Sequence, residues 1–197
     1  ITFYYTSNVD VAPYAVHYML QKPGTDGTLS EHFTESDIFT EGTGDIGKKL
    51  TIYPQIHTGY TMLDDAVVVN GGDNHNKEHV YKETTDGRDS FAFTVDASGT
   101  ELYVYYKLNT YSYTVKHLVY GTEEELASET VASNQYGIVV TETAQSIAGY
   151  TALAPLSKSL TIRAYDEQSG AEDPNVIVFY YLPESYRVEY KVVGNGG

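Results

Sequence analysis

The stretch that decides the fold is residues 177–181, IVFYY, in which β-branched and aromatic residues follow one another as in a buried strand. Nearly the same sequence occurs at residues 102–106, LYVYY, and at residues 1–5, ITFYY. Each copy is soon followed by a second alternating segment: YRVEY at 186–190, YTVKH at 113–117 and YAVHY at 14–18. Two segment types that recur in one order indicate an internal repeat.

A third element strengthens the repeat. Gly-Tyr-Thr occurs at residues 59–61 and again at 149–151. A glycine precedes each tyrosine at one spacing, since Gly47 lies 60 − 47 = 13 residues before Tyr60 and Gly137 lies 150 − 137 = 13 before Tyr150. We therefore interpret the chain as a tandem array of one structural unit.

The landmarks predict the domain boundaries. We expect the tail of a preceding repeat in 1–11, a repeat with loop insertions in 12–108, a compact repeat with its linker in 109–185, and the first strand of a following repeat in 186–197. The chain thus reads as a piece of a longer polypeptide. The short linkers at 108–110 and 182–185, the second stiffened by proline, predict a semi-rigid rod. Insertions in repeats map to surface loops, where function concentrates.

The compact unit predicts an α+β, β-dominated fold. Residues 113–120 and 126–131 alternate as the two arms of a hairpin, and 159–164 and 176–181 complete a small sheet. Val140, Ala144 and Ile147 lie at i, i+4 and i+7, which predicts at most one short helix, or an extended turn, across one face of the sheet.

Composition narrows the function classes. The chain has 197 residues, 27 acidic against 12 basic, and a formal net charge of −15. This charge excludes general binding to nucleic-acid backbones and disfavours anionic membrane surfaces. Cysteine is absent, which excludes disulfides and thiolate chemistry, and no apolar run is long enough for membrane insertion. Tryptophan is absent too, yet there are 20 tyrosines, about three times the ordinary share.

The order of these motifs resembles the MucBP (mucin-binding protein) repeat of Gram-positive surface proteins. The residues that carry the resemblance are the acidic turn after 113–117, the element Ile147-Ala148-Gly149-Tyr150 and the closing aromatic strand 176–181. The resemblance covers nearly all of the second unit and, with interruptions, the first. It implies tandem ubiquitin-like β-grasp modules, each a small mixed sheet, on a wall-anchored or secreted bacterial adhesin whose partner is mucin or another host glycoprotein.

One segment of the first unit has the residues of a metal site. Asp73, His75, Glu78 and His79 lie within a single Gly- and Asn-rich insertion. The two histidines are four apart and would share a face of a helix, but the glycines and asparagines disfavour a helix there. A solvated polar loop is the favoured interpretation, with these four residues as weak candidates for a zinc or other divalent site. No cofactor is expected.

Other chemistry has little support. The acidic runs at 64–65, 123–125 and 172–173 lack the calcium-loop spacing, and a small repeat rarely forms the cleft of a glycosidase, so solvated turns are favoured. No nucleophile elbow or phosphate loop is present. Lys116 and Asn175, with Glu142 as the acid, are a candidate pair for an intramolecular isopeptide bond, although lysines on edge strands are more often solubilising.

The tyrosines leave two interpretations open. Tyr60 and Tyr150 are expected in the cores. The closing pairs 105–106 and 180–181 alternate faces, so one ring of each pair points outward or into a seam between units. Tyr105 and Tyr180 are therefore weak candidates for stacking on sugar rings, against the alternative of structural packing.

These observations predict a non-enzymatic repeat segment of a bacterial surface adhesin that binds mucin or host glycoprotein weakly and multivalently. The alternative from another class is a structural spacer without a ligand. A carbohydrate-active or metal-dependent enzyme is less favoured. We expect an extracellular location, with neighbouring repeats of the same chain as partners.

Overall fold

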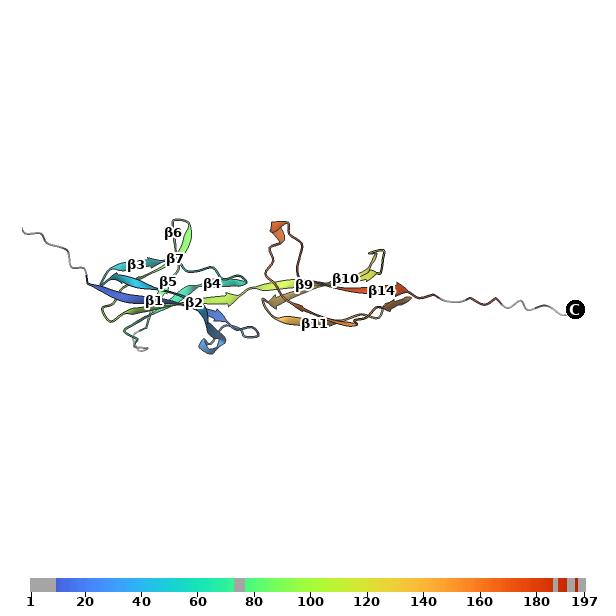
Figure 1. The fold of residues 1–197 in the computed structure, drawn as a ribbon, viewed down its shortest axis with the longest axis horizontal. Helices are drawn as coiled ribbons and strands as arrows, with labels where there is room; N and C mark the ends of the chain where they lie inside the picture. Colours follow the sequence, from blue (N-terminus) through green and yellow to red (C-terminus); the bar gives the residue numbers. More distant parts are fainter. Residues whose placement is uncertain (1–9, 73–76, 186–187, 191–193, 195–197) are drawn as a thin grey trace, which may run out of the picture. The chain divides into compact units, whose positions relative to one another are not determined.

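The computed structural model describes residues 10–72, 77–185, 188–190 and 194, and the chain divides into two compact units, Ile1–Thr110 and Tyr111–Gly197 (Figure 1). Both are β-dominated, and the described residues form no α-helix. Two short 3-10 turns occur, η1 (Ser30–His32) and η2 (Glu167–Ser169). No helix in the described part is long and apolar enough to cross a membrane.

Unit 1 consists of a five-stranded sheet and a smaller three-stranded sheet. The strands of the larger sheet, in spatial order, are β2 (Phe33–Asp45), β1 (Val11–Gln21), β8 (Thr100–Leu108), β4 (Tyr60–Asn70) and β5 (Lys77–Tyr81). The first and last strands, β1 and β8, are parallel neighbours, whereas the β1–β2, β8–β4 and β4–β5 pairs are antiparallel. The smaller sheet orders β3 (Lys49–Ile52), β7 (Arg88–Thr94) and β6 (Glu83–Thr85).

Unit 2 repeats this plan with fewer strands. Its larger sheet orders β10 (Glu125–Gln135), β9 (Thr110–Val119), β14 (Val176–Pro183) and β12 (Tyr150–Ala152), and its smaller sheet pairs β11 (Val139–Thr143) with β13 (Ser157–Thr161). The first and last strands, β9 and β14, are again parallel neighbours, and β12 is antiparallel to β14.

The two units share their strand register. Val16 pairs with Leu102 as Val115 pairs with Ile177, and Tyr60 pairs with Leu108 as Tyr150 pairs with Pro183. Leu50 opposite Phe93 likewise matches Val140 opposite Leu160. The repeated sequence motifs thus occupy the same places in two copies of one fold.

The register locates the insertions. Equivalent residues of the two units differ in number by an amount that changes along the chain. The difference is 113 − 14 = 99 in the first strand and 150 − 60 = 90 in β4. It is 160 − 93 = 67 in β7 and 181 − 106 = 75 in the last strand. Unit 1 therefore has 9 extra residues before β3 and 23 between β4 and β7, whereas unit 2 has 8 extra between β13 and β14. The 23 residues hold the second half of β4 and all of β5 and β6.

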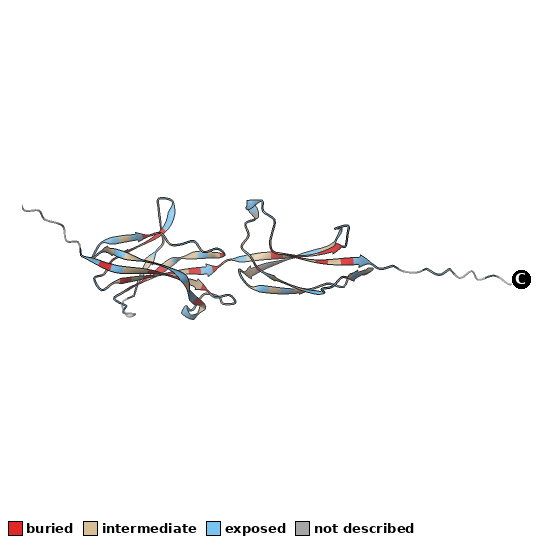
Figure 2. Ribbon diagram, in the orientation of Figure 1, coloured by how far each residue is buried: buried red, intermediate tan, exposed pale blue. Residues whose placement is uncertain are grey.

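Each core lies between the two sheets of its unit. In unit 1, Val16, Leu102 and Val104 of the larger sheet pack in one cluster with Phe91 and Phe93 of the smaller. Figure 2 shows buried residues alternating with others along the central strands, because successive side chains of a strand point to opposite faces. The core of unit 2 is smaller and centres on Ile162 and the buried residues Ile177, Phe179 and Tyr181 of β14.

In each unit a tyrosine hydroxyl of the larger sheet forms a hydrogen bond to the loop that follows β3 or β11, which we call the crossing segment. The Tyr106 hydroxyl donates to the Gln55 carbonyl at 2.7 Å, and the Tyr181 hydroxyl donates to the Gln145 carbonyl at 2.9 Å. Both rings are buried, and a buried hydroxyl needs such a partner. One ring of each closing pair therefore has a structural role.

Of the two alternatives expected for residues 140–147, a short helix or an extended turn, the structure shows no helix. Val139–Thr143 is the strand β11, and a loop follows it. Val140, Ala144 and Ile147 do pack against the core, as their apolar character suggests. Val140 and Ala144 are an even number of residues apart, so they also share a face of an extended chain. The i, i+4 spacing therefore could not distinguish a helix from a strand that turns.

The Gly-Tyr-Thr motif holds the end of each last strand. Gly59 and Gly149 both have φ of 81°. Their carbonyls accept the N–H groups of Asn109 and Glu184, at 2.9 and 2.8 Å. The threonine hydroxyls add a second bond, Thr61 to the Asn109 side chain and Thr151 to that of Glu184. The residue that leaves each unit is thereby fixed to its own unit.

Several sequence predictions fall at the edges of the described chain. Residues 1–9 and 186–187, and with them most of the predicted flanking strands, lie outside the described residues. Val188 and Tyr190 are described, are exposed and belong to no strand. Tyr60 and Tyr150, expected within the cores, are half-buried and pack against the core clusters.

Gly149→Ala should lower the free energy of unfolding of unit 2 by about 1–2 kcal/mol, the cost of a left-handed backbone for a residue with a Cβ. No heavy atom lies within 4 Å of the added Cβ, so the backbone alone sets the effect. Denaturant unfolding followed on resonances of unit 2 measures it. Gly149→Asn is the matched control, because asparagine tolerates this conformation; equal losses for Ala and Asn would contradict this origin.

Candidate functional site

A cleft of about 910 Å³ opens on unit 1 between the β3–β4 connection and the turn that leads into β7. Its walls combine aromatic rings with polar and charged groups. The lining residues that matter below are Tyr53, Gln55, His57, Tyr60, Arg88 and Asp89. Aromatic surface with a few polar groups in a concave site is the usual form of a ligand site.

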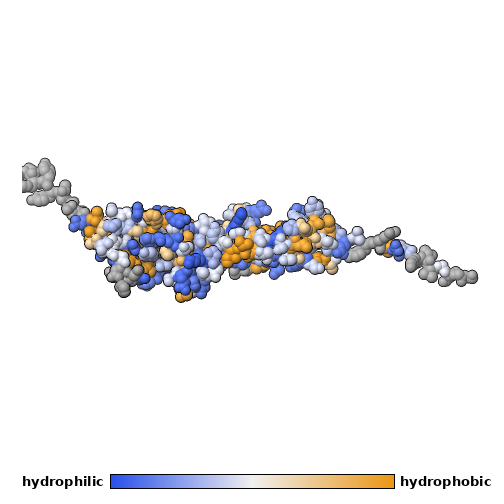
Figure 3. All heavy atoms as spheres, turned by 60° about the horizontal axis from the view of Figure 1, so that its bottom comes forward, coloured by the Kyte–Doolittle hydropathy of each residue, from blue (hydrophilic) through white to orange (hydrophobic). Residues whose placement is uncertain are grey.

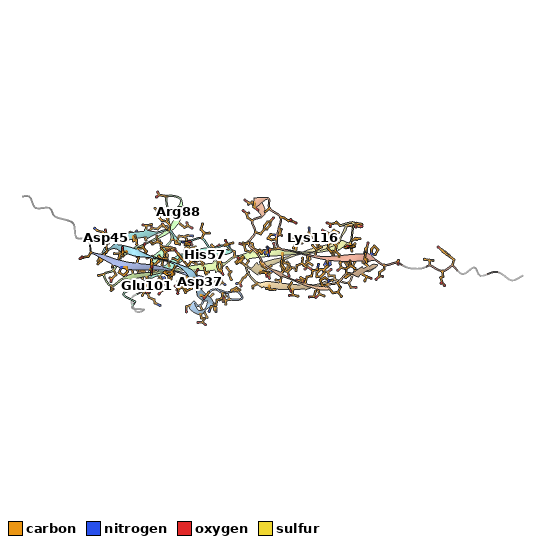
Figure 4. All side chains as sticks on the ribbon, in the orientation of Figure 1. Asp37, Asp45, His57, Arg88, Glu101 and Lys116 are labelled. Atoms are coloured by element: carbon orange, nitrogen blue, oxygen red, sulfur yellow. The ribbon has the colours of Figure 1, made fainter. Side chains whose placement is uncertain are left out.

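Arg88 and Tyr53 form one wall. The Arg88 guanidinium carbon lies 4.6 Å from the centre of the Tyr53 ring, a cation–π contact. Arg88 follows the turn residues Asp86 and Gly87, whose φ values are 53° and 74°. In the described part of the chain Arg88 forms no ion pair, so its charge is available to a ligand. Figure 4 labels Arg88 and His57 on unit 1.

The neighbouring acid of the cleft is already paired. Lys82 lies 3.5 Å from Asp89 and 2.7 Å from Asp64. The hydrogen bond to Asp64, together with the charges of both aspartates, raises the pKa of Lys82. Lys82 is shared between the two aspartates, so Asp89 and Arg88 line the cleft as adjacent groups of opposite charge.

His57 forms part of the floor. Its ring lies 4.7 Å from that of Tyr106 and 5.5 Å from that of Tyr18. Its Nε2 atom is buried and has no hydrogen-bond partner among the described residues. Burial lowers the pKa of His57, so the floor is neutral at neutral pH.

Unit 2 lacks the wall of this cleft. By the register of β3 with β11, Tyr53 corresponds to Thr143 and His57 to Ile147. Arg88, at the start of β7, corresponds to Pro155. At these equivalent positions unit 2 therefore has neither the aromatic ring nor the cation of the cleft wall.

The predicted sugar-stacking residues lie outside this cleft. Tyr105 and Tyr180 are half-buried, while their neighbours Tyr106 and Tyr181 are buried in the core. Tyr105 contacts Phe33 edge-on at 5.1 Å, and Tyr180 contacts the exposed Tyr120 edge-on at 6.0 Å. Figure 3 shows apolar patches among hydrophilic residues on the visible face of each unit.

The metal candidates are only partly placed. Asp73 and His75 lie outside the described residues. Glu78 and His79 belong to strand β5 rather than to a loop, and as adjacent strand residues they point to opposite faces. His79 Nδ1 lies 2.9 Å from both carboxylate oxygens of Asp65. The described residues hold no group of three metal-binding side chains.

The other candidate pairs are not brought together. Asp64 and Asp65 have different partners, Lys82 and His79. The Asn175 side chain is buried and bonded to the backbone of Arg163 through both its oxygen and its nitrogen. Lys116 lies opposite Val178 on the face of β9 away from the core, whereas Glu142 accepts a hydrogen bond from Tyr113 on the core face.

Comparison with known proteins adds little. No protein-family model matches the chain, and no curated protein matches it in sequence. Among solved structures, the chain matches the type 2 repeat of the mucus binding protein MUB from Lactobacillus reuteri. That match has 12% sequence identity and a TM-score of 0.24, and it covers 88% of this chain and 100% of the other. A TM-score of this size carries no argument about fold or function.

Sequence reasoning missed the cleft. Arg88 and Tyr53 are 88 − 53 = 35 residues apart and meet only through the pairing of β3 with β7, where Ile52 lies opposite Phe91. One signal was present: residues 53–57, YPQIH, depart from the matching TAQSI of unit 2. A departure at an equivalent position of a repeat marks a place where the two copies differ in role.

His117 is the buried histidine of unit 2. The Tyr181 hydroxyl donates its hydrogen bond to the Gln145 carbonyl. His117 must therefore donate from Nδ1 to the Tyr181 oxygen, 2.8 Å away. Its Nε2 is then a bare buried acceptor without a partner among the described residues. Burial lowers the pKa of His117, against the smaller opposing effect of Glu129.

Both units should lose stability as the pH falls from 7.5 to 5. The pKa of His57 and of His117 is lower in the folded chain than in the unfolded chain, so the unfolded chain takes up the proton first as the pH falls. The neutral histidines therefore contribute to stability above the unfolded pKa of about 6.5. That contribution is lost as the pH falls toward the pKa of the folded state. His57→Ile and His117→Phe should reduce the pH dependence of unit 1 and unit 2 respectively. Denaturant unfolding at both pH values, followed on resonances of each unit, measures this.

Both substitutions follow the repeat. Ile147 occupies the place of His57 in unit 2, and phenylalanine at 117 is the ring of Tyr18, the residue at that place in unit 1, without its hydroxyl. The exposed pair His79–Asp65 provides the control, because exposed pairs contribute little to stability and His79→Gln should leave the free energy of unfolding of unit 1 nearly unchanged. A pH dependence that persists in full in the buried-histidine variants would refute their role.

Proposed function

We propose that this chain is a non-enzymatic segment of a bacterial surface adhesin that binds glycan chains of mucin or another host glycoprotein through the cleft of unit 1. The observation that carries the proposal is the Tyr53–Arg88 wall. An aromatic ring stacks on the apolar face of a sugar, while Arg88, Gln55 and Thr61 can serve hydroxyl or anionic groups.

The fold supports a repeat of the β-grasp kind. In both units the first strand forms a hairpin with the second and lies parallel to the last, and a short ribbon crosses the sheet where the ubiquitin-like fold has a helix. We propose residues 12–108 and 109–185 as the two repeats, in agreement with the motif-based resemblance to MucBP repeats. Wall anchoring or secretion, in a Gram-positive bacterium, belongs to the same proposal.

The open form of the cleft suggests weak binding by one copy. A shallow site immobilises a flexible sugar chain without burying much of it, and useful attachment then comes from many copies on one cell. The outer-face rings Tyr105 and Tyr180 are the rival platform within the same proposal.

Tyr53→Ala should weaken glycan binding about tenfold, since the loss of a stacking ring costs on the order of 1.4 kcal/mol. The measurement is a mucin-glycan array probed with the chain, singly and multimerised, followed by titration of the best glycan. Tyr180→Ala is the control and should bind as the wild type does.

Each other outcome assigns a different role. Silence of the array in both formats would favour the structural spacer. A loss with Tyr180→Ala or Tyr105→Ala but not with Tyr53→Ala would move the platform to the outer face of a sheet. Release of sugars from mucin by the chain would show an enzyme.

A further inference from the structure

The last strand of unit 2 has an edge that its counterpart in unit 1 does not expose. The Thr114 N–H donates to the Asn175 carbonyl at 2.9 Å, and the Tyr120 N–H donates to the Tyr181 carbonyl at 2.8 Å. The backbone groups of a strand alternate between its two sides, so the odd-numbered residues of β14 face β9. Val176, Val178 and Tyr180 therefore direct their backbone groups to the other side.

On the side of β14 away from β9, the described residues cover only the C-terminal end of the strand. β12 pairs with Tyr181–Pro183, and the Leu153 N–H donates to the Tyr180 carbonyl at 2.8 Å. Toward the start of β14, no backbone group in the described part of the chain pairs with Val176 or Val178 on this side. We name residues 176–178 the open edge of β14.

In unit 1 the same edge is filled by a strand. Val176 corresponds to Glu101 and Val178 to Tyr103, and these residues of β8 pair with Val69 and Val67 of β4. The strand that fills the edge belongs to the 23-residue insertion, which unit 2 lacks. Unit 1 thus shows that this fold accepts one more antiparallel strand at this position.

A lysine contacts the open edge of β14, where unit 1 has the strand β4. By register, Lys158 of β13 corresponds to Phe91 of β7, a residue of the core cluster that also holds Ala66 and Val68 of β4. The Lys158 ammonium lies 5.5 Å from the centre of the Phe179 ring and donates to the Val178 carbonyl at 2.6 Å. It satisfies the carbonyl that the N–H of a neighbouring strand would otherwise bind.

Lys158 is one of few basic residues in unit 2, and of those described it is the one whose ammonium contacts β14. The described basic side chains of unit 2 are Lys116, Lys158 and Arg163, in a chain with net charge −15. Lys116 lies opposite Val178 on β9, and the Arg163 backbone is bonded to Asn175, the residue before β14 (Figure 4 labels Lys116). Asp173 also lies near that end and bonds the Asn175 N–H. An incoming strand that displaces Lys158 would leave a cation ready to pair with a carboxylate.

We propose that the open edge of β14 is a docking site for an extended peptide strand of a partner protein, running antiparallel to β14 and carrying acidic residues. Strand addition supplies main-chain hydrogen bonds, and alternate side chains supply specificity. Small β-branched residues suit the positions that Ala66 and Val68 fill in unit 1, and the acidic residues pair with the released Lys158.

The test is an NMR titration of the complete ¹⁵N-labelled chain with an end-blocked peptide of residues 64–70, DDAVVVN, which has both properties. We expect saturable binding and about tenfold slower exchange of the Val176 and Val178 amide hydrogens, with little change at Ile177 and Phe179, which already bond to β9. The peptide with an N-methyl group on its first valine, the counterpart of Val67, lacks the N–H for the Val178 carbonyl and should not bind.

Charge is tested with a second peptide, NNAVVVN. The wild type should prefer the acidic peptide about fivefold, the size of an exposed ion pair, and Lys158→Met, which keeps the aliphatic stem, should abolish this preference. The proposal is overturned if neither peptide saturates, if the N-methyl peptide binds equally well, or if the affected amides lie elsewhere. A dimer seen by sedimentation that itself protects Val176 and Val178 would assign the edge to a second copy and overturn the proposal as well.

Discussion

The parallel pairing of the first and last strands is the interaction on which each unit depends. β1 with β8, and β9 with β14, bring together residues far apart in the sequence and place an alternating apolar strand at the centre of each sheet. Because a one-residue slip would turn Leu102 or Ile177 out of the core, burial fixes the register. Everything else is added to this pair: a hairpin on one side, a third strand on the other and a ribbon across one face.

The two units show how one scaffold supports different surfaces. The 23-residue insertion of unit 1 extends β4, adds β5 and β6, and with the turn before β7 places Arg88 against Tyr53. Unit 2 does without these residues and leaves part of β14 unpaired, with Lys158 where unit 1 has Phe91. A lysine at an exposed strand edge is a common protection against unwanted strand pairing, and here the same residue gives the edge its charge.

Polar groups inside the units restrict them further. The Tyr106 and Tyr181 hydroxyls each bond a carbonyl of the segment that crosses the sheet, and the Gly-Tyr-Thr motifs bind the residue that leaves each unit. Buried polar groups are costly when unpaired, so these bonds help specify one arrangement of the crossing segment. The Nε2 atoms of His17, His57 and His117 are the exceptions, buried and without a partner among the described residues. Burial lowers the pKa of His57 and of His117, which favours their neutral forms.

The sequence by itself determined the repeat, the strand identity of its recurring segments and that the two rings of the pairs 105–106 and 180–181 lie on opposite faces, because alternation and spacing are local properties. It left a helix open at Val140 and Ala144, since a spacing of four residues suits a helix and a strand alike. Only the tertiary structure decided that Tyr53 meets Arg88, that Lys158 replaces Phe91 and that the start of β14 lacks a neighbour. These features depend on the pairing of strands distant in the chain, and no local pattern encodes which strand an insertion will add to a sheet.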